Sequence, residues 1–340
     1  MTPPAPRYIQ LYPTVRCNQH CFFCFNGFSC SSKGLSFGSA GTLPDLSFQD
    51  SLKLLPILAD QGTREIDVMG GEPLLLPWMP DFAKTASRQG MQVNISTNGS
   101  CPGSIIQFKD GDRQKITIGV SLEGSSEERH NLITKSSHFS LAMGTIETLL
   151  SLDLNFVVKT VVSRTTVPDI RNIIDLLRSL GIRRYYLIHM DILTGNRAIM
   201  KEALSYPDFK SFCDHMQDAN RDMEIFTVSA SCFTKELIGH RARCSGGVNK
   251  LSVLSDGSVF PCNLFHGFSE FYLGNVLQDE FASIWENSRL DAFREPPGDI
   301  CDNMCINKGS CTGGCPAHGH YHSGYLHSRD VRCELPHVNA

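Results

Sequence analysis

Near its amino end the chain reads Cys17-Asn18-Gln19-His20-Cys21-Phe22-Phe23-Cys24, three cysteines at CxxxCxxC spacing. They directly follow Tyr8–Val15, a largely apolar segment that predicts a strand. In a parallel α/β fold, side chains just past the carboxyl end of a strand lie where such folds bind their ligands. The motif therefore predicts a metal-binding loop at the functional end of a parallel sheet.

The distribution of the fourteen cysteines favours metal ligands over disulfides. They gather within 17–30 and 244–333, and only Cys101, Cys213 and Cys232 lie between. Clustered thiols in a reducing compartment are more often metal ligands. We expect a cytoplasmic protein, because the start MTPPAPRY lacks a signal-peptide core and no apolar run reaches about 18 residues. A net charge of -4 argues against nucleic-acid and membrane partners.

Three thiolates in the first loop suggest an iron–sulfur cluster with an incomplete ligand set. A [4Fe-4S] cluster has four irons and normally four cysteine ligands, so three cysteines leave one iron open. S-adenosylmethionine (SAM) can chelate that iron through its amino and carboxylate groups, and one electron can then break a C–S bond of its sulfonium. The alternative is a zinc site completed by His20 or Cys30.

Residues 7–190 alternate strand-like and helix-like segments, which indicates βαβ units and a parallel sheet. The further predicted strands are Glu65–Met69, Gln92–Thr97, Lys115–Ser121, Asn155–Val162 and Arg184–His189. Helices are expected over 47–61, 139–150, 169–180 and 207–219. Periodicity alone leaves two arrangements open, an open doubly wound sheet and a partial barrel.

Three more short motifs lie at the ends of successive predicted strands. They read Met69-Gly70-Gly71-Glu72-Pro73, Ser96-Thr97-Asn98-Gly99 and Ser121-Leu122-Glu123-Gly124. Glycines allow a backbone to approach a ligand closely, and acceptor groups suit an ammonium. Each motif alone is a common turn sequence, whereas their order on successive strand ends is specific.

With these motifs, and with the aromatic Phe23 just before Cys24, the chain resembles the radical SAM superfamily. The resemblance implies an α/β fold, a partial (β/α)6 TIM-like barrel, in which Cys17, Cys21 and Cys24 hold a [4Fe-4S] cluster that binds SAM. It also implies SAM contacts from Gly70, Gly71, Glu72, Pro73, Ser96, Asn98, Ser121 and Glu123. Family members often pair the SAM carboxylate with the Arg of a His-Asp-x-x-Arg segment. The segment His130–Lys135 contains no Arg, so Lys135 or Arg164 is expected to supply the positive charge.

The last hundred residues resemble the SPASM domain of peptide- and protein-maturing radical SAM enzymes. They carry Cys244, Cys262, Cys301, Cys305, Cys311, Cys315 and Cys333, with CxxxC where the family usually has CxxC. The resemblance implies that Cys244, Cys262 and Cys315 hold auxiliary cluster I, and that Cys301, Cys305, Cys311 and Cys333 hold auxiliary cluster II. The fourth iron of cluster I is then either open or bound by Cys232. A pair of zinc sites is the alternative.

We expect a radical SAM core over 1–190, a bridging region over 191–243 and a small Cys-rich SPASM domain over 244–340. His189 and Asp191, at the end of the sixth predicted strand, are expected to face the barrel cavity as catalytic candidates.

The resemblance implies maturation of a ribosomal peptide or protein, with a separate peptide-recognition protein and a flavodoxin or ferredoxin as electron donor. Asn263 stands where Ser- or Cys-oxidising members carry a basic Asp, which argues against sulfatase-type maturation. A small-molecule enzyme, such as a sugar or aminocyclitol dehydrogenase or epimerase, and a non-catalytic redox or zinc protein are the alternatives.

Overall fold

The computed structural model describes residues 5–25, 43–230, 233, 244–295, 300–301 and 311–333. Within these ranges one sheet contains β1 (Tyr8–Leu11), β2 (Glu65–Val68), β3 (Gln92–Thr97), β4 (Ile116–Ser121), β5 (Phe156–Val162), β6 (Arg184–His189), β7 (Glu224–Val228), β8 (Lys250–Val253), β9 (Ser258–Phe260) and β10 (Gly274–Asn275). The longer helices are α1 (Phe48–Asp60), α2 (Met79–Arg88), α4 (Glu127–Thr134), α5 (Phe139–Ser151), α6 (Ile170–Ser179), α8 (Tyr206–Ala219) and α11 (Pro316–Ser323). Shorter helices are α3 (Pro102–Ile105), α7 (Arg197–Glu202), α9 (Phe281–Trp285) and α10 (Asp291–Arg294).

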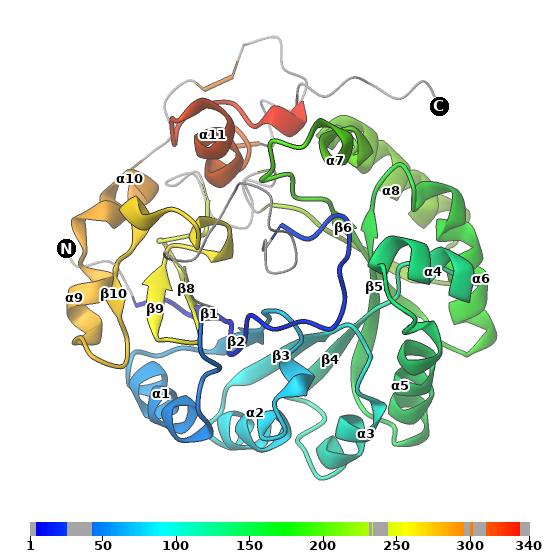
Figure 1. The fold of residues 1–340 in the computed structure, drawn as a ribbon, viewed down its shortest axis with the longest axis horizontal. Coiled ribbons are helices and arrows are strands. Elements are labelled where there is room, and N and C mark those ends of the chain that lie inside the picture. Colours follow the sequence, from blue (N-terminus) through cyan, green and yellow to red (C-terminus); the bar gives the residue numbers. More distant parts are fainter. Residues whose placement is uncertain are drawn as a thin grey trace.

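Strands β1 to β7 lie side by side in chain order, and each neighbouring pair is parallel. On the other side of β1, β8 pairs with it in parallel, and β9 and β10 continue the sheet antiparallel. Figure 1 shows the sheet curling into an incomplete ring with helices on its outer side, and α11 and α7 in the arc between α10 and α8. The predicted partial barrel is therefore confirmed.

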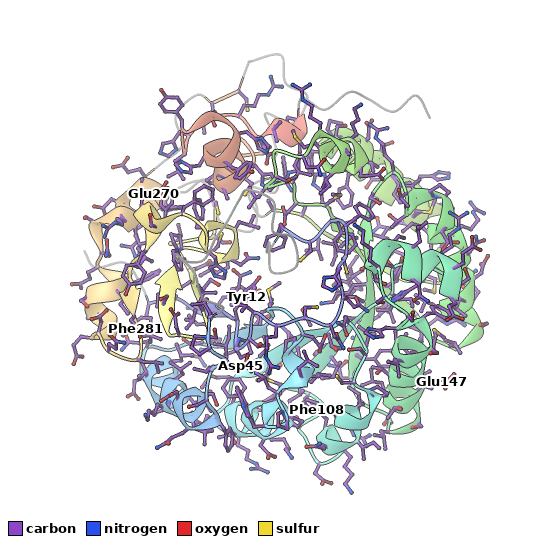
Figure 2. All side chains as sticks on the ribbon, in the orientation of Figure 1. Tyr12, Asp45, Phe108, Glu147, Glu270 and Phe281 are labelled. Atoms are coloured by element: carbon purple, nitrogen blue, oxygen red, sulfur yellow. The ribbon has the colours of Figure 1, made fainter. Side chains whose placement is uncertain are left out.

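The two faces of the curved sheet differ in polarity, because alternate residues of a strand point to opposite faces. The face under the helices is fully buried and apolar, with Ile66, Val68, Val93, Ile95, Ile118, Val120, Val158 and Leu187. The residues between them point into the ring and are polar and only partly buried, as are Glu65, Asp67, Asn94, Ser96 and Lys159. Figure 2 shows Tyr12 on the inner side of the ring and Glu147 on the outer side. The hydrophobic core thus lies between sheet and helices and leaves a polar lumen.

The sheet extends beyond the six predicted strands. β7, in the expected bridging region, pairs with β6, and β8 pairs with β1 in the register Tyr8↔Lys250. The carboxyl-terminal segment therefore continues the sheet of the core, and the domain limits at 190 and 243 stay a prediction. β1 ends at Leu11 rather than Val15 because Pro13 has no N–H to donate to a strand ladder. None of the described helices has the length and apolarity of a membrane span.

Candidate functional site

The cysteine loop that follows β1 is held by the last turn of α4. The N–H of His20 donates to the carbonyl of Thr134 at 3.0 Å, and the N–H of Phe22 donates to the carbonyl of Ile133 at 3.2 Å. The last carbonyls of a helix have no partner within it and are free to accept from another segment. The helix after β4 thereby fixes the middle of the CxxxCxxC loop.

The glycine pair after β2 packs directly against the backbone that leads into Cys17. The N–H of Gly71 donates to the carbonyl of Thr14 at 3.0 Å, and a Cβ at Gly71 would lie 1.9 Å from the carbonyl oxygen of Arg16. Gly70 has a φ of +127°, and a Cβ there would lie 2.4 Å from the Thr14 oxygen. Only glycine permits this approach, so the pair lies beside the cysteine loop as the motif order predicts.

Glu72 is completely buried and joins the ends of β2 and β3. Its Oε1 accepts from the N–H of Leu74 at 2.9 Å and from the hydroxyl of Thr97 at 2.8 Å, and its Oε2 accepts from the N–H of Asn98 at 2.6 Å. Burial raises the pKa of the carboxyl, and these hydrogen bonds oppose that rise. The predicted SAM contact is thus a carboxylate with three protein donors that fixes Asn98, and Pro73 begins the short turn that follows it.

Asn98 connects the third strand end to the cysteine loop. Its Nδ2 donates to Oδ1 of Asn18 at 2.9 Å and lies 3.8 Å from the Sγ of Cys17. The amide of Asn18 in turn donates to the hydroxyl of Ser100 at 2.8 Å. The cysteine loop, the glycine pair and the end of β3 therefore form one hydrogen-bonded unit.

The thiols of this loop occupy an environment that suits a bound cation. Burial raises the pKa of Cys17 and of Cys21, and the nearby carboxylates of Glu72 and Glu123 raise them further. A metal ligand must be a thiolate, so bound metal supplies the positive charge that the loop lacks. No three His, Cys, Asp or Glu side chains among the described residues converge as ligands of a single ion. A cluster differs, because each cysteine binds a different iron, and the donor set fits a cluster with three thiolates.

Lys159 of β5 is a lumen cation that no motif marked. Its Nζ donates to the hydroxyl of Ser96 at 2.6 Å, and a Cβ at Gly119 would lie 2.9 Å from the same nitrogen. Ser121 is its register partner on β4. Burial lowers the pKa of the ammonium, and nearby carboxylates oppose that effect. The alternation of side chains along the strand could have revealed this position in the sequence. Lys159 follows Val158, which points to the buried face, so Lys159 points into the ring.

Glu123, at the end of β4, lies near Cys21 but is fully buried. Its carboxylate accepts from the N–H of Val161 at 3.0 Å, and its own N–H donates to Nδ1 of His130 at 3.2 Å. Burial raises the pKa of Glu123 to about 8, and the Val161 hydrogen bond opposes the rise. The predicted SAM contact at this strand end is thus a buried acid held by a backbone N–H.

Lys135 and Arg164, the two cations expected near the SAM carboxylate, lie at the ends of different helices. Lys135 is the exposed C-cap of α4, in the left-handed conformation with a φ of 49°. Arg164 is bound to the α7 end, where its N–H donates to the carbonyl of Glu202 and its Nε to the carbonyl of Lys201, both at 2.8 Å. The hydrogen bond to Ser96 is made by Lys159.

His189 does not face the lumen, and this part of the prediction is wrong. Its ring stacks on Phe209 of α8, with centroids 4.4 Å apart, and its Nε2 is 3.1 Å from the carbonyl of Leu204. Burial lowers its pKa to about 3. His189 shares its strand face with the fully buried Tyr185 and Leu187, so the period of β6 already indicated a core position.

Replacing His189 by Phe is expected to leave SAM cleavage at the parental rate and to destabilise the fold by about 1–3 kcal/mol, since the buried Leu204 carbonyl loses its partner. The folded-state pKa is depressed, so the parent loses stability as pH falls from 6.5 toward 3, and the variant has a shallower loss. Urea unfolding at pH 7 and 5 measures both effects, with the exposed His215→Gln as control. A folded variant without SAM cleavage would restore His189 as a catalytic candidate.

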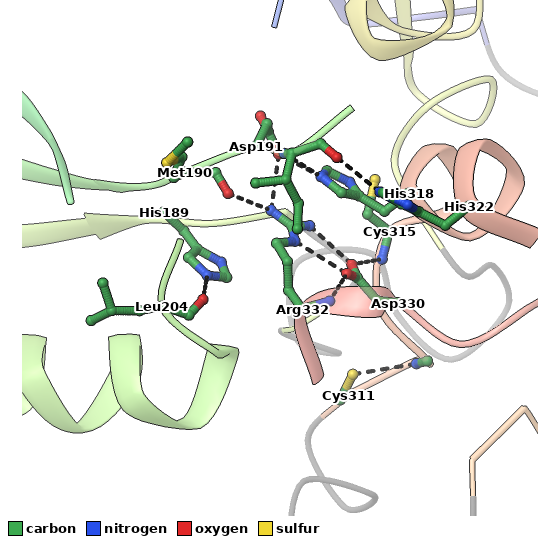
Figure 3. A network of polar contacts seen from close by, with 12 residues as sticks. His189, Met190, Asp191, Leu204, Cys311, Cys315, His318, His322, Asp330 and Arg332 are labelled. Atoms are coloured by element: carbon green, nitrogen blue, oxygen red, sulfur yellow. Dashed lines mark hydrogen bonds and ion pairs between the residues drawn. The ribbon is translucent and has the colours of Figure 1, made fainter. Parts of the chain in front are cut away.

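Asp191 lies just beyond β6 and keeps 25% of its side chain exposed. Its Oδ1 accepts from Nη1 of Arg332 at 2.9 Å, as Figure 3 shows. The charge of Asp191 contributes to the raised pKa of Tyr12, as do Cys24 of the first loop and Cys262 of the carboxyl-terminal segment. We infer that Asp191, unlike His189, faces both cysteine groups.

Of the carboxyl-terminal cysteines that the structure describes, Cys244, Cys262 and Cys315 are electrostatic neighbours of one another. Burial raises the pKa of Cys262 to about 12, the Lys250 ammonium opposes that rise, and Cys244 and Cys315 add to it. A Cβ at Gly246 would lie 3.4 Å from both the Cys244 Sγ and the Cys262 Cβ.

A second group of cysteines lies around Cys333. Burial raises the pKa of Cys333 to about 12, with Asp330, Cys311 and Cys301 among the neighbours that add to the rise. Cys30, Cys232 and Cys305 lie outside the described residues. Of the remaining cysteines, Cys213 is buried in α8.

Comparisons with known proteins agree with this arrangement. A family model described as the radical SAM superfamily matches residues 11–197, and one described as an iron-sulfur cluster-binding domain (SPASM) matches residues 244–315. An AdoMet-dependent heme synthase of Methanosarcina barkeri is 26% identical, over 97% of this chain and 96% of its own. The Bacillus subtilis protein AlbA, named for biosynthesis of the antilisterial bacteriocin subtilosin, is 22% identical over 96% of this chain and 71% of its own.

Two solved structures share the fold. Streptococcus suis SuiB bound to SAM has a TM-score of 0.77 at 16% identity and covers 98% of this chain and 78% of its own. The protein anSMEcpe, with bound AdoMet and a peptide, has a TM-score of 0.73 at 17% identity and covers 97% of this chain and 94% of its own. The two matched families bind a [4Fe-4S] cluster with SAM and auxiliary iron–sulfur clusters, and these are the cofactors of this chain. The chain belongs to the radical SAM superfamily and has a SPASM domain at its carboxyl end.

Proposed function

We propose that this radical SAM enzyme matures a peptide by removing hydrogen from one of its carbons. The hydrogen-bonded unit of cysteine loop, glycine pair and β3 end is the observation that carries the enzyme assignment. The peptide is supported by the names of relatives, which include the PqqA peptide cyclase and the mycofactocin maturase MftC. SuiB, which shares the fold, has also been solved with its precursor peptide SuiA. A separate recognition protein and a flavodoxin or ferredoxin are the proposed partners.

In the proposed mechanism, Cys17, Cys21 and Cys24 hold the cluster, and the backbone of Gly70 and Gly71 receives the methionine end of SAM. When bound, the cluster would supply the one-electron reduction that cleaves SAM for hydrogen abstraction. Asn98 holds the loop beside Cys17, and its own position is set by Glu72. Asp191 is the proposed substrate contact, since its carboxylate is held at Oδ1 and stays partly exposed.

Lys159 is the proposed positive charge for the SAM carboxylate in place of Lys135 and Arg164. Its Nζ is held by Ser96, one of the predicted SAM contacts, and Gly119 leaves room for its stem. A hydrogen bond to a charged group contributes about 1.5–3 kcal/mol.

Replacing Lys159 by Met is therefore expected to weaken SAM binding by about 10- to 150-fold. Anaerobic equilibrium binding of SAM to the reconstituted protein measures the change. The exposed Lys53→Met, on α1, is the matched control and should bind as the parent does. An unchanged dissociation constant for the Lys159 variant would remove this residue from the SAM site.

Asn263, the residue after Cys262, argues against one type of reaction, the base-assisted oxidation of a side chain. Asn263 donates through Nδ2 to the hydroxyl of Tyr12 at 2.9 Å, and its N–H donates to Oε1 of Gln10 at 3.1 Å. A neutral amide cannot accept a proton at neutral pH. We therefore propose that hydrogen abstraction is followed by a reaction that needs no base at this position, such as crosslink formation. Base-assisted oxidation of a Ser or Cys side chain is not proposed.

A second candidate substrate is a tetrapyrrole, because two of the named relatives are an AdoMet-dependent heme synthase and an Fe-coproporphyrin III synthase of Methanosarcina barkeri. Sugars and aminocyclitols remain the other small-molecule candidates. All of these reactions use the same radical chemistry and differ in the carbon that loses hydrogen.

Deuterium transfer distinguishes these substrates. The reconstituted protein is incubated anaerobically with dithionite, SAM and one labelled substrate, and 5′-deoxyadenosine is analysed for deuterium. We expect label from a deuterated short peptide encoded near the gene, and none from an iron porphyrin or an aminocyclitol. Label from the porphyrin alone would replace the peptide proposal by the second candidate. Tightly held zinc and no deoxyadenosine would exclude the enzyme reading.

A further inference from the structure

Arg332 is a completely buried cation with two carboxylate partners. Its Nε and Nη2 donate to the two oxygens of Asp330 at 3.1 and 2.9 Å, and its Nη1 donates to Oδ1 of Asp191 at 2.9 Å. Figure 3 shows the guanidinium between these two acids. A guanidinium keeps its charge when buried, and its planar fork matches two carboxylates in fixed positions. Such a group is costly to bury, so its geometry has to be well satisfied.

Asp330 connects this cation to a cluster ligand. Its Oδ2 accepts from the N–H of Cys315 at 2.8 Å. The residue before, Gly314, has a φ of +77°, and a Cβ there would lie 2.2 Å from the Cβ of Asp330. Cys333 immediately follows Arg332 in the chain. The Asp330–Arg332 pair is therefore adjacent to proposed ligands of both auxiliary clusters.

The same network reaches the end of β6. Besides Asp191, the carbonyl of Met190 accepts from Nη1 of Arg332 at 3.5 Å. The N–H of Ile192 donates to Nε2 of His318 on α11 at 3.0 Å. The same nitrogen lies 3.6 Å from Oδ1 of Asp191, which is longer than a hydrogen bond. Residues 190–192 are thus held by the segment that carries the auxiliary ligands.

We propose that Asp330 and Arg332 form a positioning unit that sets Cys315 and Cys333 in place relative to Asp191. Loading of the auxiliary clusters and the geometry of the substrate contact then depend on each other. This inference deepens the proposed function, since it assigns Asp191 to the substrate side of the site. Its test uses neither substrate nor SAM cleavage, so its failure would leave the proposed function standing, and failure of the peptide proposal would leave the positioning unit standing.

The first test uses the full chain with Cys17, Cys21 and Cys24 replaced by Ala, so that only the auxiliary clusters load. Arg332→Met, Arg332→Lys and Asp330→Asn are compared with the exposed Arg289→Met, which also removes one charge. Iron per chain and the EPR spectrum of the reduced protein are measured. We expect a changed EPR signal in Arg332→Met and Asp330→Asn, a partial change in Arg332→Lys, and the parental signal in the control.

The second test measures how firmly the Asp330–Arg332 pair holds the residues around Asp191. Hydrogen exchange of residues 190–193 in the fully loaded native chain is expected to be about tenfold faster in Arg332→Met, with parental exchange in β2 to β5. A changed EPR signal, or loss of about four irons, together with this local effect supports the proposal. If exchange rises throughout the sheet, Asp330→Asn, which keeps an acceptor for the Cys315 N–H, replaces the Met variant. The parental EPR signal with parental exchange at 190–193 overturns the proposal.

Discussion

Replacing Cys21 by Ala is expected to reduce SAM cleavage to background and to remove about four of about twelve irons per chain. Two thiolates remain in the loop, Cys17 and Cys24, and a cluster with two protein ligands is not retained. Cys21 is buried beside Glu123 and the other two thiols, so the substitution removes one member of this group of thiols. Iron analysis and deoxyadenosine formation with dithionite measure the two effects.

The matched control for this substitution is Cys213→Ala in α8, a buried cysteine far along the chain from any cluster motif. It removes one sulfur from the core and should cost only the cavity that it leaves. We expect it to keep all its iron and the parental cleavage rate. If Cys21→Ala cleaves SAM as well as this control does, the three-thiolate cluster is not the catalytic group.

Gly71→Ala is expected to abolish SAM binding, because a single methyl group cannot fit between the two strand ends. Its Cβ would lie 1.9 Å from the carbonyl oxygen of Arg16 and 2.8 Å from that of Val15. The backbone of residues 15–16 must move, which displaces the segment that leads into Cys17. Overpacking of a rigid site costs about 1–3 kcal/mol or more, and we expect the unfolding midpoint in urea to fall accordingly.

Gly144→Ala is the control for this prediction. Gly144 lies inside α5, and a Cβ there would meet no atom within 4 Å. Alanine is the better helix former, so this variant should be more stable than the parent by roughly 0.5–1 kcal/mol and should bind SAM equally well. Anaerobic SAM binding and urea unfolding are measured for both variants. Parental SAM affinity in Gly71→Ala would show that the glycine pair does not form the site.

Short-range patterns in the sequence predicted most of the fold. The five strands from Glu65–Met69 onward and the helices over 139–150 and 169–180 appear within a few residues of their predicted limits. The pairing of β7 with β6 and of β8 with β1 was not predicted, because strand pairing between distant segments leaves no periodic signal in either one.

Lys159 and Arg332 illustrate the same limit at the level of side chains. Each is an isolated charged residue without a motif, and its importance comes from partners that are distant in sequence, Ser96 for the first and Asp191 for the second. The orientation of His189 was predicted incorrectly because the prediction used its place at the end of a strand. Its strand face, which it shares with buried residues, was not considered.

The sequence by itself determined the chemistry of this protein, through three thiols, two glycines and their order on successive strands. Those features act over a few residues, because cluster ligation and close backbone approach depend on residue type and spacing. Only the tertiary structure decided which charges face the lumen and which auxiliary ligands are held together. Those outcomes depend on the register of the strands and on burial, which bring Asp330 and Arg332 to Asp191 across some 140 residues of chain.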